Sequence, residues 1–371
     1  MDIKNYRIKK NGREIMVDED ALIEGIKAGH YNGNEEYKDL EGSSPWVKLK
    51  NDDVFRKYFK DRSGRVVSSS LDPAFIDEEE DLIANATEKA LSDLKPLRMG
   101  QLLDKTFFLF KNKFWRNFKI VLFVQVFVYL INQLIKFSSI HFLKDTNYDY
   151  NTLNVISSAP GIILSSLAFL LISAAIIKAT RAQIFGLDMK PGEAYSAGRS
   201  AILPLLGTGL IAWFMVTGGL ILLIIPGIIL VFSYLMFQVI VVLERKSGFK
   251  ALARSRKLMR TKFDKGMAGS NSWRGFLLFL VNAFIAGTVT FFLIIPRMIF
   301  TAVAGMQGYF TTETTAELYK TQLAMAPFEL FESLGSSAVV PFLLIGLTVM
   351  YYDTRIRVEG FDLYIESKRV H

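Results

Sequence analysis

Arginines and carboxylates that flank long uncharged runs are the residues best suited to chemistry in this chain. Glu244 ends one such run and is followed by an arginine-rich stretch, and Asp353 ends another. Guanidinium groups bind carboxylates and phosphates through paired, charge-assisted hydrogen bonds. These charges are therefore candidates for a polar network or a site for lipid headgroups: Asp104, Glu244, Arg254, Arg256, Arg260, Asp353, Arg355, Arg357 and Glu359.

The simpler interpretation of this set is that it marks the ends of helices. Asp353 and Arg357 are four residues apart, as are Arg355 and Glu359, which is the spacing of side-chain pairs on a helix surface. An exposed pair of this kind contributes only about 0–1 kcal/mol. On this interpretation the charges set orientation and local pairing and hold no ligand.

The alternative interpretation rests on Arg256 and Arg260. Both fall on the same helical stripe as four apolar residues, Phe249, Leu252, Met259 and Phe263. An unpaired buried charge costs several kcal/mol, so arginines on such a stripe need acidic partners or a lipid phosphate. We therefore expect both arginines in a partly buried network with Glu244, Asp104 or Asp353.

Patterns typical of catalysis or metal binding are absent from the sequence. The chain has no cysteine, which excludes disulfides, thiolate zinc sites, iron–sulfur clusters and a cysteine nucleophile. Its three histidines are far apart, and no Gly-Lys-Ser, Gly-x-Ser-x-Gly or His-Glu-x-x-His motif occurs. We predict no enzyme activity and no cofactor.

Long apolar runs must position these charges. A helix crosses about 30 Å of hydrocarbon with about 20 residues. The uncharged run between Arg199 and Glu244 holds 44 residues, too many for one span, so we predict a hairpin at Pro226-Gly227. The fold is predicted to be mainly α, a bundle of six transmembrane helices at residues 118–137, 153–177, 201–223, 226–243, 275–296 and 333–352.

Polar residues inside these runs are neutral, among them Gln125, Asn132, Gln238 and Asn282. The predicted spans hold no Asp, Glu or His near their middle, which speaks against a proton relay. We expect the neutral side chains to form hydrogen bonds between helices.

The basic residues predict the orientation of the spans. Lys and Arg number 44 against 36 Asp and Glu, the pI is about 9.3, and 24 basic residues flank one side of the spans while three flank the other. Basic residues concentrate on the cytoplasmic side of membrane proteins, so we place both termini in the cytoplasm and the protein in a bacterial inner membrane. The basic excess then indicates contact with the lipid bilayer rather than with nucleic acid. The first residues lack the apolar stretch of a signal peptide.

Three amphipathic stretches, residues 99–118, 192–202 and 249–263, each precede a pair of predicted spans. Helices of this kind lie in the membrane interface. The domain at residues 96–365 is therefore predicted to contain three copies of one unit, which is a surface helix followed by a hairpin of two spans.

Residues 1–62 form a small α+β soluble domain in our interpretation. Residues 6–8 and 46–49 are strand-like, Asn11-Gly12 is a hairpin turn, and Asp18 begins a helix that ends near Lys27. An acidic, serine-containing stretch, residues 63–95, follows as a flexible linker that is either a solvated spacer or folds back onto the basic cytoplasmic face.

Several segments resemble known families. "YRIKKNG", "DEDALIEGIKAG" and "SSPWVKL" are similar to the GYF-like domains at the ends of bacterial membrane proteins, although the Gly-Tyr-Phe signature is absent. That resemblance implies a protein-binding head in which Tyr6 and Trp46 contact the partner. The alternative is a small folded head with Trp46 simply in its core.

The membrane part resembles the six-span bacterial family called the glycerophosphoryl diester phosphodiesterase membrane domain. The resemblance covers residues 97–365 and rests on "MGQLLDKTFFLFKNKF", "IIPGIILVFSYLMFQVIVVLE" followed by "ALARSRKLMR", and "MYYDTRIRVEGFDL". The hydrolase domain that gives this family its name has no counterpart here.

Two functions follow as expectations from these observations. The first is a non-enzymatic membrane scaffold whose residues 1–62 recruit a cytoplasmic protein. The second is a phospholipid-handling protein or transporter that holds anionic headgroups at its arginine-rich inner face. Both functions are compatible with a homo-oligomer.

Overall fold

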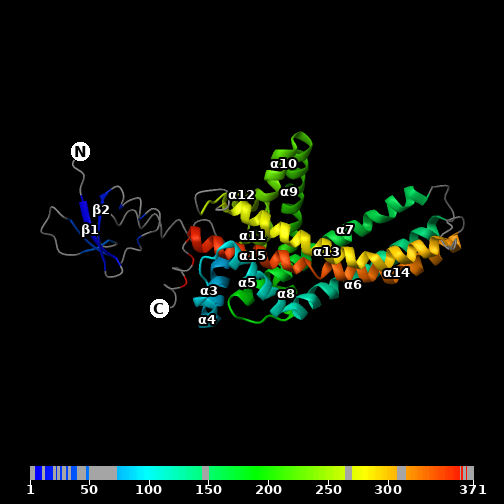
Figure 1. Ribbon diagram of the computed structural model, residues 1–371, viewed down its shortest axis with the longest axis horizontal. Coiled ribbons are helices and arrows are strands. Elements are labelled where there is room, and N and C mark those ends of the chain that lie inside the picture. Colours follow the sequence, from blue (N-terminus) through cyan, green and yellow to red (C-terminus); the bar gives the residue numbers. More distant parts are fainter. Residues whose placement is uncertain are drawn as a thin grey trace. The chain divides into compact units, whose positions relative to one another are not determined.

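The computed structural model describes residues 5–10, 13–19, 22, 26, 31, 35–39, 47–49, 73–143, 150–263, 270–306, 315–359, 361 and 365. The chain divides into two compact units, Met1–Glu80 with Val358–His371, and Asp81–Arg357. We describe each by itself (Figure 1).

The first unit contains an antiparallel sheet of four strands in the order β2-β1-β3-β4. The strands are β1 (Asn5–Lys10), β2 (Arg13–Asp18), β3 (Glu36–Asp39) and β4 (Val47–Lys48). Lys10 pairs with Arg13, so β1 and β2 are antiparallel neighbours in the sheet. This pairing agrees with the predicted hairpin, while the Asn11-Gly12 turn itself lies outside the described residues.

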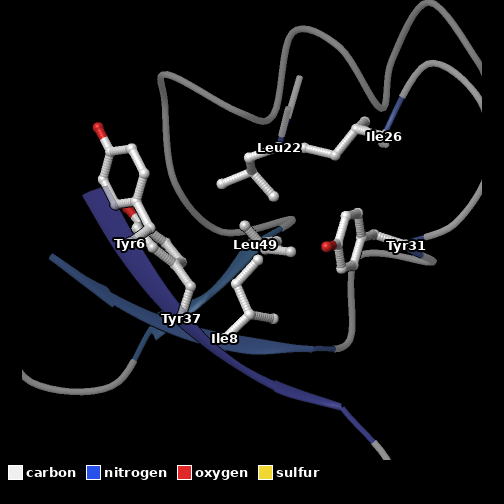
Figure 2. Close-up of a cluster of buried hydrophobic side chains, with 7 residues drawn as sticks. All are labelled: Tyr6, Ile8, Leu22, Ile26, Tyr31, Tyr37 and Leu49. Atoms are coloured by element: carbon white, nitrogen blue, oxygen red, sulfur yellow. The ribbon is translucent and has the colours of Figure 1, made fainter. Parts of the chain in front are cut away.

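Seven apolar side chains form the core of this unit: Tyr6, Ile8, Leu22, Ile26, Tyr31, Tyr37 and Leu49 (Figure 2). Tyr6 and Ile8 point to the same face because side chains alternate along a strand. The Tyr6 ring packs edge-on against Tyr37, with 5.6 Å between ring centroids, and only 7% of the residue is exposed. The Tyr6 side chain therefore stabilises the core, which leaves little of it accessible to the predicted partner. Trp46 lies outside the described residues.

Two helices occupy part of the segment that we assigned to a flexible linker. They are α3 (Pro73–Asn85) and α4 (Glu88–Ser92), and Thr87 caps α4 by accepting a hydrogen bond from the Ala90 N–H. The Thr87 N–H donates to the carbonyl of Phe185 at 3.2 Å, and Leu91 and Leu94 are buried. Residues 87–94 are thus part of the second unit and are no solvated spacer.

Helices make up the second unit. They are α5 (Met99–Asn112), α6 (Phe114–Leu143), α7 (Tyr150–Ile184), α8 (Pro191–Gly198), the 3-10 helix η2 (Arg199–Ala201), α9 (Ile202–Leu222), α10 (Ile224–Ser233), α11 (Phe237–Glu244), α12 (Gly248–Met259), α13 (Asn271–Met306), α14 (Thr315–Ser337) and α15 (Val340–Glu359). The described part of the chain contains six stretches long and apolar enough to cross a membrane: Phe114–Ser139, Ser158–Ile184, Pro191–Leu222, Ile224–Glu244, Asn271–Met306 and Lys320–Glu359. Six spans were predicted, and this number is confirmed.

The central hairpin turns three residues earlier than predicted. The chain reverses at Leu223, which is extended, and Pro226 falls in the first turn of α10, where its missing N–H costs no helical hydrogen bond. A Cβ on Gly227 would lie 2.5 Å from side-chain atoms of Leu220. Gly227 therefore allows α9 and α10, which lie side by side in Figure 1, to approach closely.

The last span is longer than predicted and is interrupted. It covers Lys320–Glu359 and includes both α14 and α15, whereas the predicted span, 333–352, bridges the break between them. Glu329 and Glu332 consequently lie inside a spanning stretch, on a helix that packs along α6 and α13. The fourth span is interrupted too, between α10 and α11.

The element order agrees with the predicted repeat in part. The short helices α5 and α12 each precede a pair of long apolar stretches, whereas α8 forms the beginning of the third stretch, Pro191–Leu222. The buried face of α5 consists of Leu102, Thr106 and Leu109, and the rings of Phe107 and Phe110 pack on Phe342 of α15. α5 is therefore part of the helical core and not only a surface element.

Candidate functional site

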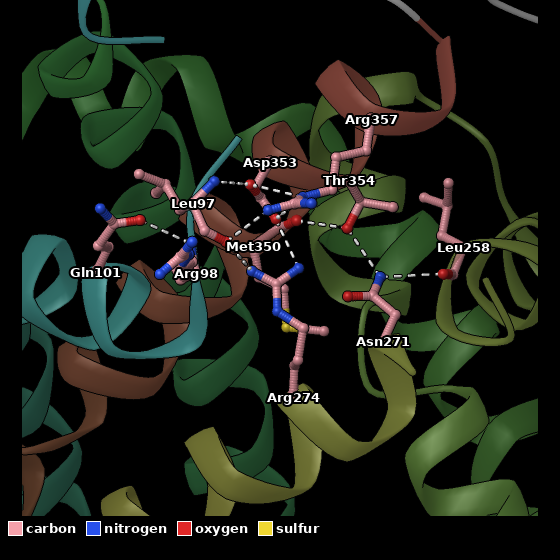
Figure 3. Close-up of polar contacts among 10 residues, drawn as sticks. All are labelled: Leu97, Arg98, Gln101, Leu258, Asn271, Arg274, Met350, Asp353, Thr354 and Arg357. Atoms are coloured by element: carbon pink, nitrogen blue, oxygen red, sulfur yellow. Dashed lines mark hydrogen bonds and ion pairs between the residues drawn. The ribbon is translucent and has the colours of Figure 1, made fainter. Parts of the chain in front are cut away.

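A carboxylate on α15 lies at the centre of a cluster of polar contacts (Figure 3). Asp353 is only 2% exposed, and its Oδ2 lies 2.6 Å from Nη1 of Arg274 on α13. The Nε of Arg357, one helical turn along, lies 3.2 Å from both carboxylate oxygens. This contact confirms the predicted pair of Asp353 and Arg357.

The same cluster holds the backbone ahead of α5. The Leu97 N–H donates to Oδ1 of Asp353 at 2.6 Å, and the Leu97 carbonyl accepts from Nη2 of Arg274 at 3.0 Å and Nη2 of Arg357 at 2.7 Å. The ring of Phe263 lies within cation–π distance of both guanidinium groups, 5.6 Å from Arg274 and 4.9 Å from Arg357. Both backbone polar groups of Leu97 are thus held, which fixes the start of α5. We call this cluster the Asp353 clasp: Leu97, Arg274, Asp353 and Arg357.

An amide extends the clasp to α12. The Nδ2 of buried Asn271 donates to the carbonyl of Leu258 at 3.0 Å and to Oγ1 of Thr354 at 2.8 Å (Figure 3). Four chain segments therefore meet here: the residues before α5, the end of α12, the start of α13 and the end of α15.

A second cluster surrounds Glu244, at the end of α11. This side chain is completely buried and accepts hydrogen bonds from Nε of Arg254 at 2.9 Å, Nζ of Lys246 at 2.9 Å and the hydroxyl of Tyr351 at 3.0 Å. Arg245 adopts a φ of 54°, the left-handed conformation that commonly ends helices. The chain turns there, which allows the side chains of Lys246 and Arg254 to contact the Glu244 carboxylate.

Arg355 belongs to the same neighbourhood. It is 1% exposed, its guanidinium lies 5.7 Å from the ring centre of Tyr351, and it adds a favourable Coulomb interaction with Glu244. One buried carboxylate is thus surrounded by three cations. We call Lys246, Glu244, Arg254, Tyr351 and Arg355 the Glu244 cluster.

Another ion pair joins the end of α5 to the loop after α7. Nζ of Lys113 lies 2.9 Å from Asp188, and Nη1 of Arg116 lies 3.5 Å from it. The hydrogen bond and the charge of Lys113 lower the pKa of the Asp188 carboxyl. Because the Asp188 side chain is 68% exposed, solvent screens this pair and its contribution to stability is small.

The structure separates the predicted set of charges. It places Asp353 and Arg357 in the clasp, and Glu244, Arg254 and Arg355 in the Glu244 cluster. Asp104 is exposed on α5, and Glu359 is half-buried at the end of α15.

The prediction of a partly buried network around Arg256 and Arg260 is wrong, because both side chains are exposed. The buried face of α12 consists of Ala251, Leu252, Ser255, Leu258 and Met259, whereas Phe249 is 68% exposed. The apolar stripe on which this prediction rested is therefore only partly a buried face.

Sequence reasoning missed four contributors to the two clusters: Leu97, Lys246, Arg274 and Tyr351. Arg274 directly precedes the span predicted at residues 275–296, and a charge at a buried helix end needs a partner. Leu97 contributes only backbone atoms, so its side-chain type carries no signal.

The exposed face of α12 borders a hollow of about 560 Å³. Arg256, Lys257 and Arg260 supply its charge, Phe249 and Met215 its apolar surface, and none of the three cations forms an ion pair with a described residue. A hollow with three available cations beside exposed apolar side chains suits an anionic, amphiphilic ligand. We call it the α12 hollow.

A second layer of ion pairs lies at the other end of the long helices. Lys136 of α6 pairs with Glu329 of α14 at 2.7 Å, and Arg297 of α13 pairs with Glu332 of α14 at 3.3 Å. Lys136 is 20 residues from Arg116 on α6, or about 30 Å at 1.5 Å per residue. This separation matches the thickness of a bilayer's hydrocarbon core, about 30 Å.

No family model, curated protein or solved structure matches this chain. Within the described ranges, no group of three or more His, Asp or Glu side chains is arranged to hold a metal ion.

Proposed function

We propose that this chain is a lipid-binding, multi-pass protein of a bacterial inner membrane, with the α12 hollow as a site for anionic phospholipid headgroups at the cytoplasmic face. The observation that carries the proposal is the exposure of Arg256, Lys257 and Arg260 beside Phe249. Arginine binds phosphate oxygens in a bidentate manner, and an exposed aromatic ring can enter the boundary between headgroups and acyl chains. The burial of Tyr6 removes one of the two residues on which a protein-binding head was based, so the scaffold is the less supported function.

The position of α12 supports this proposal. The helix follows Glu244, where the fourth span ends, and precedes Asn271, where the fifth begins. Its exposed face therefore lies at the level where lipid headgroups lie, on the side that carries most basic residues. Each basic residue near an anionic membrane surface contributes about 1 kcal/mol of attraction.

Removing two charges from the α12 hollow is expected to weaken binding of anionic lipid. We expect the Arg256→Gln/Lys257→Gln variant to bind phosphatidylglycerol about 30-fold more weakly, since two contributions of about 1 kcal/mol are lost. The measurement is titration of the purified full chain with phosphatidylglycerol, with phosphatidylcholine as the reference lipid.

The matched control is Lys111→Gln/Lys250→Gln, which removes the same net charge from two exposed lysines outside the hollow. This control is expected to bind nearly as tightly as the wild type. Equal losses in the two variants would mean that net charge alone governs binding, and the α12 hollow would be no site.

The proposed orientation can be tested directly because the chain has no cysteine of its own. We expect an impermeant maleimide to label Met306→Cys in intact cells, since Met306 is 89% exposed at the end of α13. Lys257→Cys, exposed on α12, is expected to react only after the membrane is opened. Labelling of Lys257→Cys in intact cells would reverse the orientation and contradict a cytoplasmic α12 hollow.

A further inference from the structure

A cavity of about 940 Å³ lies among α6, α7, α9 and α14, away from the α12 hollow. Its volume is within the range of pockets that bind small ligands, about 300–1,000 Å³. One end is lined by polar side chains of α6 and α14, including Gln133, Lys136 and Glu329, and the other by apolar side chains of α7 and α9. This division suits a molecule with a polar head and an apolar tail.

The polar end contains an acceptor that lacks a donor. Gln133 is only 8% exposed, and its Nε2 donates to the Glu329 carboxylate at 2.7 Å. A carboxylate only accepts, so this contact fixes the orientation of the amide and directs Oε1 elsewhere. Oε1 is buried and has no hydrogen-bond partner among the described residues.

Asn132 provides a second acceptor in the same cavity. Its Oδ1 is also buried and lacks a hydrogen-bond partner within the described ranges. It lies 2.7 Å from the position that a Cβ would take on Gly161 of α7, so the glycine leaves room for it. A buried acceptor without a partner costs about 1–3 kcal/mol, which a ligand with N–H or O–H donors would recover.

The charges at this end cancel. Nζ of Lys136 lies 2.7 Å from Oε2 and 2.9 Å from Oε1 of Glu329, so the pair has no net charge. A headgroup that is neutral as a whole and carries both a phosphate and a hydrogen-bond donor fits such a pair better than an anionic headgroup.

The apolar end is open to the side. Phe169 of α7 and Leu210 and Trp213 of α9 line it while being 42%, 50% and 58% exposed. Phe169 is 11 residues from Ser158, which lines the cavity near the start of the second span, so the cavity runs about 16 Å along α7. An acyl chain can enter between these helices from the bilayer.

We propose that this cavity binds one phospholipid whose headgroup carries a primary ammonium, as ethanolamine does. The ammonium donates to Oε1 of Gln133 and Oδ1 of Asn132, the phosphate lies near Lys136, and acyl chains follow the apolar end. Choline lacks N–H donors and cannot satisfy either acceptor. The site lies beside Lys136 and Glu329, in the layer of ion pairs about 30 Å from Arg116, and thus at the level of the outer-leaflet headgroups.

Competition among lipids tests this proposal. The full chain is purified from bilayers that hold equal amounts of phosphatidylethanolamine, phosphatidylcholine and phosphatidylglycerol, and the retained lipids are identified by native mass spectrometry. We expect the wild type to retain phosphatidylethanolamine over phosphatidylcholine. Gln133→Leu and Asn132→Leu are each expected to lower that preference about tenfold, the effect of one hydrogen bond to an ammonium.

Gln125→Leu is the matched control. Gln125 also lies on α6 and donates to Ser333 of α14, but it does not line the cavity, so its removal is expected to leave the lipid preference unchanged. Equal retention of ethanolamine and choline lipids by the wild type would overturn the proposal, as would a preference for phosphatidylglycerol at this site. The Arg256→Gln/Lys257→Gln variant, which is altered in the α12 hollow, is expected to keep the preference for ethanolamine. The proposal for the cavity can therefore be refuted independently of the proposal for the α12 hollow.

Discussion

Replacing Asp353 by alanine is expected to lower the free energy of unfolding by about 3–5 kcal/mol, the effect of breaking a buried ion pair by removing one partner. The substitution leaves Arg274 buried beside an uncompensated guanidinium of Arg357, and it releases the Leu97 N–H. The measurement is the melting temperature of the detergent-solubilised chain. Proteolysis after residue 95 should become faster as well, because the start of α5 is no longer held.

Two further variants serve as comparisons for Asp353→Ala. Asp104→Ala removes the same charge from an exposed position on α5 and is expected to change stability by no more than about 0.5 kcal/mol. Asp353→Asn keeps an acceptor of the same size, so it should fall between the wild type and the alanine variant. Equal shifts for Asp353→Ala and Asp104→Ala would show that the clasp contributes nothing to stability.

Removing the carboxylate of Glu244 is expected to have a similar effect, about 3–5 kcal/mol. Glu244→Ala leaves Arg254, Lys246 and Arg355 close together without the anion that compensates them. Tyr351→Phe removes only one neutral donor from the same carboxylate, and its expected cost is about 1–3 kcal/mol because the acceptor keeps its other partners.

A double-mutant cycle with Arg254 separates the ion pair from general loss of packing. Adding Arg254→Ala to Glu244→Ala should cost much less than Arg254→Ala does in the wild type, because the second substitution removes a charge that the first left unpaired. Additive effects would mean that the two residues do not interact, in conflict with their 2.9 Å contact.

The clasp and the Glu244 cluster explain why many charged residues of this chain are poor candidates for binding a ligand. Asp353 and Glu244 already accept hydrogen bonds from several donors, and their partners are buried or half-buried. These two carboxylates hold the ends of the helices together. The groups available to a ligand lie elsewhere, on the exposed face of α12 and in the cavity beside Gln133.

The number and type of the main elements follow from local patterns of residues. Hydropathy is a local property, so six apolar stretches could be counted before any contact was known, and all six are present. The strand-like residues before the Asn-Gly dipeptide likewise indicated a hairpin, and β1 and β2 pair as antiparallel neighbours. The pair of Asp353 and Arg357 could be predicted because both residues lie on one helix.

The burial of individual charges and the identity of their partners depend on how the helices pack. Arg254 and Arg256 differ by two positions on α12, about 200° around the helix at 3.6 residues per turn, so one points to Glu244 and the other to the exterior. A helical wheel shows that the two faces differ but not which face meets the neighbouring helices. Asp353 binds Arg274, 79 residues away, and the backbone of Leu97, 256 residues away. Those contacts depend on how the helices pack, and no local pattern of residues specifies them.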